Sequence, residues 1–584
     1  MAKSQNQQPS SSAKLSKAIL SRIFTYVRPY RFRFFLGLFF VITLSALSIS
    51  RPLLIQQTLN RFIQDKDLSY LGYMTVLLIA IVFTEALLQL SNMMNAGFLG
   101  TSIVRDLRLQ VFRHLLSMRN KYFDSSPVGM LVTRSVSDIE SLGEVFSEGF
   151  IIIFGDILSL LVFFVAMLFV NWKLTLIAMT TVPVLIVATR IFQRGVKKTF
   201  DAVRNAVSAL NTFVQEHISG MKVVQIFTRE EAEYQKFREI NETHKNANIK
   251  SIWYYSVFFP VIEILSSVSI GLIIWIGVSG EKIYPGTIVF FIMLIHMFFR
   301  PIRMLADRIN ILQMGLVASE RVFKVLDTKE VIASEGNISA KNIRGRIEFK
   351  NVWFAYEEEN WILKDVSFVV QPGECLAIVG ATGAGKSSII NLIGRYYEYN
   401  KGEILVDGIN IRDYNLNELR IAVGVVLQDV FLFSENLSRN ISLFNSGISD
   451  EQILQSAKKI GAFEFIHRLP GGLQFNAGER GVTLSSGQRQ MVSFLRAYVH
   501  NPAVLILDEA TSNIDTETEI LIQRATEELT KGRTSIIIAH RLSTIQRADR
   551  ILVLDSGNII EQGSLSQLLE LNGSFKKLYD LQFA

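Results

Sequence analysis

One stretch in the second half of the chain decides its fold: Gly380-Ala381-Thr382-Gly383-Ala384-Gly385-Lys386-Ser387. It matches GxxxxGK[ST], the phosphate-binding loop, or P-loop, that lies between a buried parallel strand and a helix. The context fits, because the apolar run 376–379 precedes the loop, and Ile389 and Leu392 follow it with helical spacing. Further apolar runs at 423–427 and 504–507 are typical of buried parallel strands. The sequence therefore predicts an α/β P-loop domain.

Each residue type in this loop suits a phosphate group. Glycines let successive backbone N–H groups approach the oxygens, Lys386 supplies a point charge to the β- and γ-phosphates, and the Ser387 hydroxyl can bind Mg²⁺. The expected nucleotide-binding residues here are Gly380, Thr382, Gly383, Ala384, Gly385, Lys386, Ser387 and Ser388.

Two motifs further along narrow the choice among kinases, GTPases, motors and transporters. Ser485-Ser486-Gly487-Gln488 opens an apolar helix, where backbone amides suit an anion, although Ser485 also reads as an ordinary N-cap. Asp508 follows the run 504–507 and would hold Mg²⁺, and Glu509 would orient or deprotonate the attacking water. An Asp-Glu pair after a strand is common, so this second motif supports an assignment only together with the others.

The first half of the sequence has a different character. The 584 residues carry a formal charge of +7, which divides into +13 before residue 345 and −6 after it. Six apolar stretches lie in the basic half, at about 34–58, 71–99, 145–170, 172–193, 255–278 and 287–305, and each can span a bilayer as a helix. Basic residues interleaved with such stretches do not favour a nucleic-acid partner. The single cysteine, Cys375, excludes an intramolecular disulfide and a cysteine metal site.

Lysine and arginine residues set the orientation of these spans. They are frequent in residues 1–33, 100–144 and 194–252 and sparse in the short segments between the other span ends. Because such residues stay on the cytoplasmic side, we expect both termini in the cytoplasm. The polar N-terminus does not read as a cleaved signal, and residues 14–30 are expected to form an amphipathic helix along the inner face.

The two long basic segments show helical periodicity, so we expect them to extend as helices below the membrane. Each is interrupted near its middle, the first at Ser125-Ser126-Pro127-Val128-Gly129 and the second at Ser219-Gly220. Short helices at these breaks would touch whatever follows the spans.

The order of these features resembles the half-transporter exporters of the ATP-binding cassette (ABC) superfamily, over almost the whole chain beyond about residue 15. The resemblance implies an all-α transmembrane domain with six spans followed by an α/β P-loop cassette. The expected divisions are a cytoplasmic N-terminus with an elbow helix at 1–33, the transmembrane domain at 34–320, a linker at 321–344 and the nucleotide-binding cassette at 345–584.

The resemblance also implies roles for single residues. Tyr356 would stack on adenine, Gln428 would meet the metal and the transmembrane domain, and His540 would contact the γ-phosphate. Residues 484–488 resemble the signature that closes over ATP held by the other subunit, Asp515 resembles a dimer-contact aspartate, and 479–481 resembles an exporter-specific loop. The implied catalytic residues are Glu509, His540 and Gln428, and the implied Mg²⁺ ligands are Ser387, Gln428 and Asp508. Ser486 and Asn513-Ile514 depart from the commonest forms of these motifs.

The expected function is ATP-driven export, by alternating access, of amphipathic compounds or lipids from the cytoplasm or inner leaflet. The cofactors would be ATP and Mg²⁺, and the protein would be multi-pass in the cell membrane with its ATPase in the cytoplasm. Since one chain carries every ATPase motif, a homodimer with two composite sites is favoured over a heterodimer. A peptide exporter and a soluble cassette ATPase are the alternatives, and the six spans oppose the latter.

Ionisable residues inside the spans are the candidates for contact with the transported compound. Ionisable residues inside spans tend to face a cavity or a partner. Glu85, Asp156, Glu263 and His296 qualify, and Glu263 with Phe258 and Phe259 would suit an amphipathic cation. Packing between helices is an equally good explanation for all of them.

Overall fold

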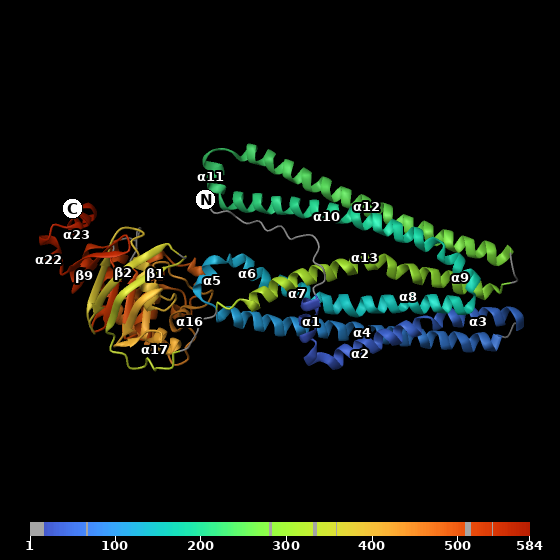
Figure 1. Ribbon diagram of the computed structural model, residues 1–584, viewed down its shortest axis with the longest axis horizontal. Coiled ribbons are helices and arrows are strands. Elements are labelled where there is room, and N and C mark those ends of the chain that lie inside the picture. The colour runs from blue at the N-terminus through green and yellow to red at the C-terminus, as the bar shows by residue number, and fades with distance from the viewer. Residues whose placement is uncertain are drawn as a thin grey trace. The chain divides into compact units, whose positions relative to one another are not determined.

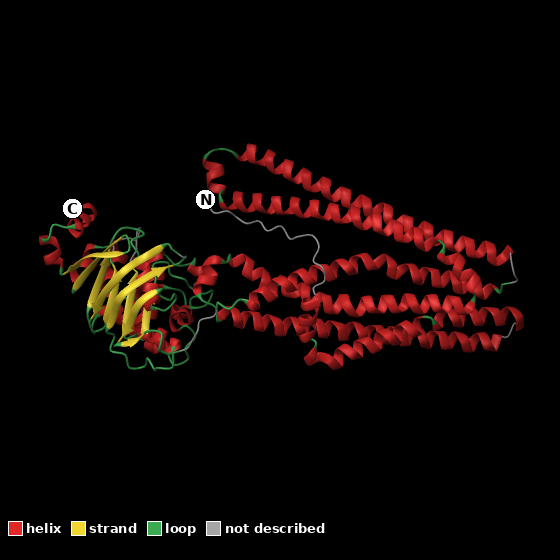
Figure 2. Ribbon diagram, in the orientation of Figure 1, coloured by secondary structure: helices red, strands yellow, loops and turns green. Residues whose placement is uncertain are grey.

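A computed structural model describes residues 17–65, 68–279, 283–330, 336–357, 359–508, 516–539 and 541–583. These residues form two compact units. The first comprises Met1–Leu116 and Val128–Thr328, and the second comprises Ser117–Pro127 and Lys329–Ala584. Figure 1 shows the elements of both, and Figure 2 shows that strands occur in the second.

The first unit is helical. Its α-helices are α1 (Lys17–Thr25), α2 (Arg31–Ser48), α3 (Ser50–Asp65), α4 (Leu68–Leu116), α6 (Val128–Ser135), α7 (Ser137–Glu144), α8 (Ile151–Val170), α9 (Trp172–Met179), α10 (Thr181–Ser219), α11 (Met221–Ile226), α12 (Glu230–Ser279) and α13 (Pro285–Asp327). A 3₁₀ turn η1 (Arg28–Tyr30) and a π-helical segment η2 (Val145–Phe150) complete it.

Among the described residues, six helical segments are long and apolar enough to cross a membrane. They are Arg28–Ile63, Leu68–Leu116, Val128–Val170, Trp172–Ser219, Glu230–Val278 and Pro285–Ile302. The first five contain the stretches expected from the sequence, and the sixth ends at Ile302, three residues before the expected end at 305. Large apolar side chains are exposed on these helices, as with Phe169 at 87%. Such exposure is costly in water and favourable in lipid, so it supports a transmembrane domain.

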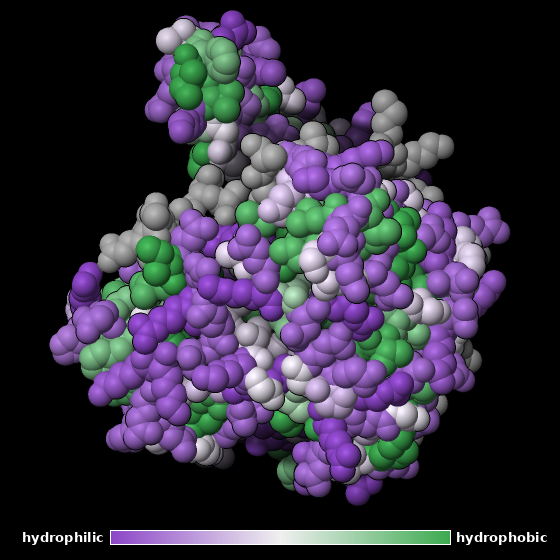
Figure 3. Space-filling view, turned by 90° about the vertical axis from the view of Figure 1, so that its left-hand side faces the viewer, coloured by the Kyte–Doolittle hydropathy of each residue, from purple (hydrophilic) through white to green (hydrophobic). Residues whose placement is uncertain are grey.

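The helical extensions below the spans are confirmed, as are short helices at both breaks. The turn between α10 and α12 contains α11, and the two long helices pack side by side (Figure 1). Gly195 permits this approach, because a Cβ there would lie 2.2 Å from the Tyr254 ring. Exposed apolar side chains gather at the tip of this hairpin, the upper lobe in Figure 3: Ile218, Met221, Val223, Ile226 and Phe227.

The second unit contains two sheets. Among the described residues, the strands are β1 (Ile347–Ala355), β2 (Trp361–Val370), β3 (Cys375–Val379), β4 (Lys401–Val406), β5 (Ile409–Asn410), β6 (Val423–Val426), β7 (Val504–Asp508), β8 (Thr534–Ile538), β9 (Arg550–Asp555) and β10 (Asn558–Gly563). The smaller sheet has the order β2-β1-β4-β5, and the larger has the order β10-β9-β3-β8-β7-β6. Strands β9, β3, β8, β7 and β6 are parallel, so their carboxyl ends share one edge.

Helices cover these sheets, and two large hydrophobic clusters, beside a smaller third one, hold the cassette together. The helices are α14 (Lys386–Ile393), α15 (Leu416–Ala422), α16 (Leu437–Ser442), α17 (Asp450–Ile460), α18 (Phe463–Arg468), α19 (Ser486–His500), α20 (Thr516–Thr530), α21 (Leu542–Arg547), α22 (Leu565–Glu570) and α23 (Ser574–Phe583). One cluster joins α14 to strands β1–β4, and the other joins α16–α20 to the β6–β7 edge.

Helix α5 (Asn120–Ser125) belongs to the second unit although it continues the chain from α4. The backbone N–H of Arg119 donates to the carbonyl of Glu330, at 3.0 Å, which ties its start to the segment after α13. Helix α13 itself continues to Asp327, so the first part of the segment expected as a linker is helical.

Candidate functional site

The P-loop crosses from β3 to α14 in a tight backbone path. Gly380 has a φ of +156°, and a Cβ there would lie 2.2 Å from the Leu554 carbonyl. Gly385, at φ +106°, is the N-cap of α14, where a Cβ would press on Leu363. Only glycine fits both constraints. Ala381, Thr382, Gly383 and Ser387 are exposed along the loop, and Ala384 is buried.

Lys386 is buried at the start of α14. Its ammonium donates to the carbonyls of Gly380 and Ala381, at 2.7 and 2.9 Å. Burial lowers the pKa of Lys386, and the Asp508 carboxylate opposes that shift. The cation is thus held across the mouth of the loop, where a phosphate would replace the weak carbonyl acceptors with charged ones.

The acidic and amide candidates lie at the same sheet edge. Asp508 ends β7, and Gln428 is exposed two residues beyond the end of the neighbouring strand β6. With the exposed Ser387 at the start of α14, they form an oxygen donor set of carboxylate, amide and hydroxyl. This is the chemistry Mg²⁺ prefers, so the residues present fit that ion.

Tyr356 lies beside the P-loop helix. Its hydroxyl is 3.2 Å from the Ser388 hydroxyl and accepts a hydrogen bond from the Asn391 amide at 3.0 Å. The ring meets Phe354 and Tyr397 edge-on, with centroids 4.7 and 4.8 Å away. These contacts place the aromatic ring beside the first turns of α14, and its stacking on adenine stays a prediction.

The signature residues open α19. The Ser485 hydroxyl accepts from the Gln488 N–H at 3.2 Å, and the Ser485 N–H donates to the Gln488 side-chain oxygen at 3.0 Å, so they form a capping box. The N-cap reading of Ser485 is confirmed, and the binding of an anion by the amides at this helix start stays a prediction. Ser486 is exposed and Gly487 is buried. Before this helix, 479–481 form a 3₁₀ turn in which Arg480 has a positive φ.

Three expected site residues, Glu509, Asp515 and His540, lie outside the described residues. Glu509 directly follows Asp508 at the end of β7, and His540 follows Ala539 just beyond β8.

Sequence reasoning missed three residues around Tyr356. Tyr397 packs on its ring, Asn391 hydrogen-bonds its hydroxyl, and Asp124 of α5 accepts a hydrogen bond from the Tyr397 hydroxyl. Asp124 and Tyr397 are 273 positions apart, and neither stands in a nucleotide-binding motif. Only the aromatic run around Tyr397 was a signal in the sequence.

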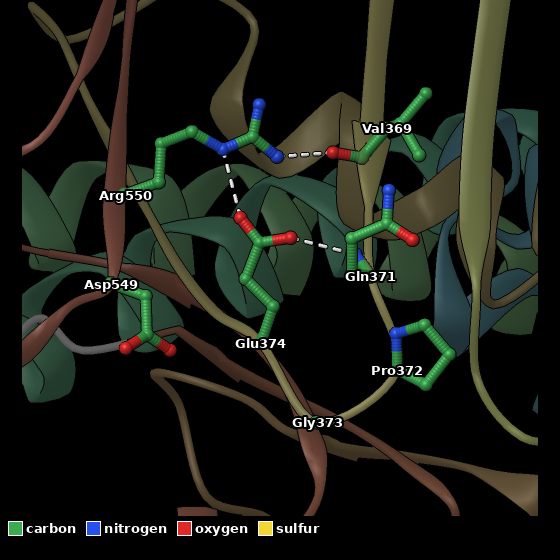
Figure 4. A pocket seen from close by; sticks show the side chains of 7 residues that line it. All are labelled: Val369, Gln371, Pro372, Gly373, Glu374, Asp549 and Arg550. Carbon is green, nitrogen blue, oxygen red and sulfur yellow. Dashed lines mark hydrogen bonds and ion pairs between the residues drawn. The ribbon is translucent and has the colours of Figure 1, made fainter.

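A hollow elsewhere on the cassette lies at the amino end of β3, opposite to the P-loop end of that strand (Figure 4). Arg550 donates to the Glu374 carboxylate at 2.8 Å and to the Val369 carbonyl, and Glu374 accepts from the Gln371 N–H at 2.6 Å. Because these polar groups bond to one another, the lining of this open hollow is held by internal bonds rather than built for a ligand.

Two of the ionisable candidates in the membrane unit lie near basic residues. Glu85 of α4 is near Arg51 of α3, and Asp156 of α8 interacts with Arg300 and Arg308 of α13. His296 is exposed on α13.

Glu263 lies on α12 in an open hollow with Phe259, Pro260, Ile264, Ser267 and Val268. Phe258, expected beside Glu263, is instead buried against Phe192, with ring centroids 3.9 Å apart.

Comparison with protein families gives two matches. The family described as "ABC transporter transmembrane region" matches residues 34–302, and the family described as "ABC transporter" matches residues 363–512.

Several relatives match over nearly the full chain. An ATP-dependent lipid A-core flippase of Desulfotalea psychrophila is 34% identical over 571 residues, covering 97% of this chain and 100% of the relative. A probable multidrug resistance ABC transporter ATP-binding/permease protein of Bacillus subtilis is 35% identical over 491 residues. This match covers 82% of this chain and 72% of the relative. A solved structure of a bacterial Atm1-family ABC exporter with ATP bound matches with a TM-score of 0.76 at 26% identity. The match covers 95% of this chain and 98% of the exporter chain.

Proposed function

Since this chain belongs to the ABC transporter family and is an ATP-driven exporter, we propose that two copies of it form a homodimer that exports amphipathic compounds or lipids. The protein is a multi-pass membrane protein with a cytoplasmic ATPase that couples hydrolysis to transport. We also propose that each ATP site binds Mg²⁺ and that both termini lie in the cytoplasm.

The main support for the homodimer proposal is that the P-loop and the signature lie in different parts of the cassette. Helix α14 packs in one hydrophobic cluster with β1–β4, whereas α19 packs with α16, α17 and α20 in the other. A signature that acts on phosphate therefore fits a loop supplied by a second chain. Because this chain carries both halves, two copies would complete two sites.

We propose a role for each expected residue within a site, supported by the positions of those that the structure describes. Lys386 and the P-loop amides would hold the phosphates, Tyr356 would support the base, and Ser387, Gln428 and Asp508 would hold Mg²⁺, which neutralises developing phosphate charge. Glu509 would orient or deprotonate the attacking water, and His540 would contact the γ-phosphate. Ser485 to Gln488 and Asp515 of the second copy would close the site.

The substrate class rests on the relatives and on the membrane unit. One relative is named a lipid A-core flippase and another a probable multidrug resistance transporter, and the open hollow on α12 combines Glu263 with apolar neighbours. An amphipathic molecule with a cationic group suits this lining.

The base assignment has a direct test. Glu509→Gln in purified full-length protein is expected to lower ATP turnover about a hundredfold or more, since a positioned base contributes on that scale. Binding of ATP should persist, measured with a fluorescent ATP analogue. Hydrolysis at the wild-type rate would show that Glu509 is not the base.

The substrate class is tested in reconstituted vesicles of phosphatidylethanolamine and phosphatidylglycerol. A cationic dye or a glycolipid is expected to stimulate the ATPase, and short peptides are not. Stimulation by peptides alone would favour the peptide-exporter alternative. Activity that appears only when a different half-transporter is co-expressed would favour the heterodimer.

A further inference from the structure

Tyr397 lies between α5 and the aromatic side chains beside the P-loop. Its hydroxyl donates a hydrogen bond to the Asp124 carboxylate of α5. Its ring meets the Tyr356 ring edge-on, with centroids 4.8 Å apart at 88°. One side chain therefore touches both the helix that continues α4 and the ring that is positioned for adenine.

A second set of contacts holds this arrangement to the P-loop helix. Asn391 of α14 donates to the Tyr356 hydroxyl, and the Asn391 carbonyl accepts from the Tyr397 N–H at 3.4 Å. Phe354 closes the cluster, with its ring centroid 5.9 Å from that of Tyr397. Since the three rings and Asn391 pack on one another, a movement of Tyr356 has to be accommodated by Tyr397.

The bond to Asp124 is directional and charge-assisted. Burial and the Asp124 carboxylate both raise the pKa of Tyr397, so the phenol stays protonated and serves as the donor. Asp124 itself is exposed on α5, and the segment it belongs to is also tied by the bond from Arg119 to Glu330. A phenol-to-carboxylate bond is stronger than a neutral one, and it is lost when either group is removed.

We propose that Tyr397 is a positioning residue that links adenine binding at Tyr356 to the position of α5 through its hydroxyl bond to Asp124. Helix α5 is joined covalently to α4 and α6 of the membrane unit, so its position bears on transport. The inference rests on the proposed function, because it requires a nucleotide whose base lies on Tyr356.

The chain offers a matched control two residues away. The Tyr399 hydroxyl is also hydrogen-bonded, to Asn410 at 3.1 Å, and its ring is buried in the same part of the cassette. Tyr399→Phe removes the same atom from a neighbouring site without touching α5. A loss of general stability would therefore appear in both variants, and a loss of coupling only in Tyr397→Phe.

The test is hydrogen exchange of the full-length protein in lipid nanodiscs, with Mg²⁺ and either the ATP analogue AMP-PNP or tripolyphosphate. Protection of residues 380–387 reports phosphate binding, and protection of 120–125 reports the response of α5. We expect AMP-PNP to slow exchange in both segments. Tripolyphosphate, which lacks the base, should protect the P-loop and leave α5 about as exchangeable as without ligand.

The variants then identify the bond. Tyr397→Phe and Asp124→Ala should each reduce AMP-PNP protection of α5 about fivefold, and the double variant should do no more. Asp124→Asn, which keeps an acceptor, and Tyr399→Phe should retain it. P-loop protection should be unchanged in all of them.

Two results would overturn the inference alone: equal α5 protection in Tyr397→Phe and wild type, or full α5 protection by tripolyphosphate. A wild-type P-loop that AMP-PNP leaves unprotected would instead overturn the proposed function.

Discussion

Cys375, the single thiol of the chain, is half-buried at the start of β3. Burial, with Asp549 and Glu374 nearby, raises the pKa of its thiol to about 11. Because only the thiolate reacts, we expect alkylation at pH 8 to be about a hundredfold slower than for an ordinary thiol. The rate should still rise about tenfold between pH 8.5 and 9.5, where an ordinary thiol levels off. Iodoacetamide labelling followed by mass spectrometry measures it.

The control for this prediction is the same chain unfolded in urea, in which Cys375 should react as an ordinary thiol. Rapid labelling of the folded protein at pH 8, with a plateau above pH 9, would show that the thiol is neither buried nor influenced by its acidic neighbours.

At the level of single residues, the sequence predicted the positions of those candidate residues that stand together in one short motif. The P-loop, Asp508 and the capped helix start at Ser485 were predictable because each is a short motif beside its own strand or helix. The Tyr397–Asp124 bond was not, because folding brings together residues 273 positions apart. Nor does helical spacing say which of Phe258 and Phe259 packs on Phe192.

At the level of elements, the hairpin of α10 and α12 is closed by a half-buried ion pair. The two ring nitrogens of His217 lie 2.7 Å from the Phe213 carbonyl and 2.9 Å from the Glu233 carboxylate. The His217 ring also stacks on Phe213, with centroids 3.7 Å apart. This cluster joins the end of α10 to the start of α12 and so holds the ends of the turn that presents α11.

Removing this cluster should loosen α11. We expect His217→Ala to increase tryptic cleavage at Lys222 and Arg229 about fivefold, since the contacts of the His217 ring with Phe213 and Glu233 oppose local opening of the turn. Limited proteolysis with mass spectrometry gives the rate.

Glu242→Ala is the matched control, because Glu242 pairs with Lys245 within α12, on the exposed surface of that helix. Equal cleavage in His217→Ala and wild type would assign the hairpin's closure to the packing of α10 on α12 alone.

Hydrophobic runs and Ser/Gly/Pro breaks predicted the spans and the short helices α5 and α11. The π-helical segment η2, at the start of the third apolar stretch, was not predictable. There, a Cβ on Gly149 would meet Leu312, and a Cβ on Gly315 would meet Val145. The departure from α-helical geometry accompanies close packing against α13, which periodicity within one segment does not encode.

At the scale of the whole molecule, the division into a basic helical unit and a cassette was visible in charge and hydropathy. The short helix expected at the first break to touch whatever follows the spans is confirmed, because Ser117–Pro127 belongs to the cassette's unit. The residues that hold it there were not predictable. The segment between α4 and α6 is held by tertiary contacts such as that of Arg119 with Glu330. Local sequence does not determine these contacts.

The dimer proposal makes opposite predictions for two arrangements of the same substitutions. Lys386→Ala disables the P-loop, and Ser486→Asp places a charge at the exposed start of α19, where it would repel phosphate while preserving the helix. With one substitution on each chain, a mixed dimer keeps one composite site intact and should retain about half the wild-type ATPase rate. With both on one chain beside a wild-type partner, it keeps none. Mixed dimers purified through two different affinity tags allow both rates to be measured, and the reverse order of the two rates would place each complete site within a single chain.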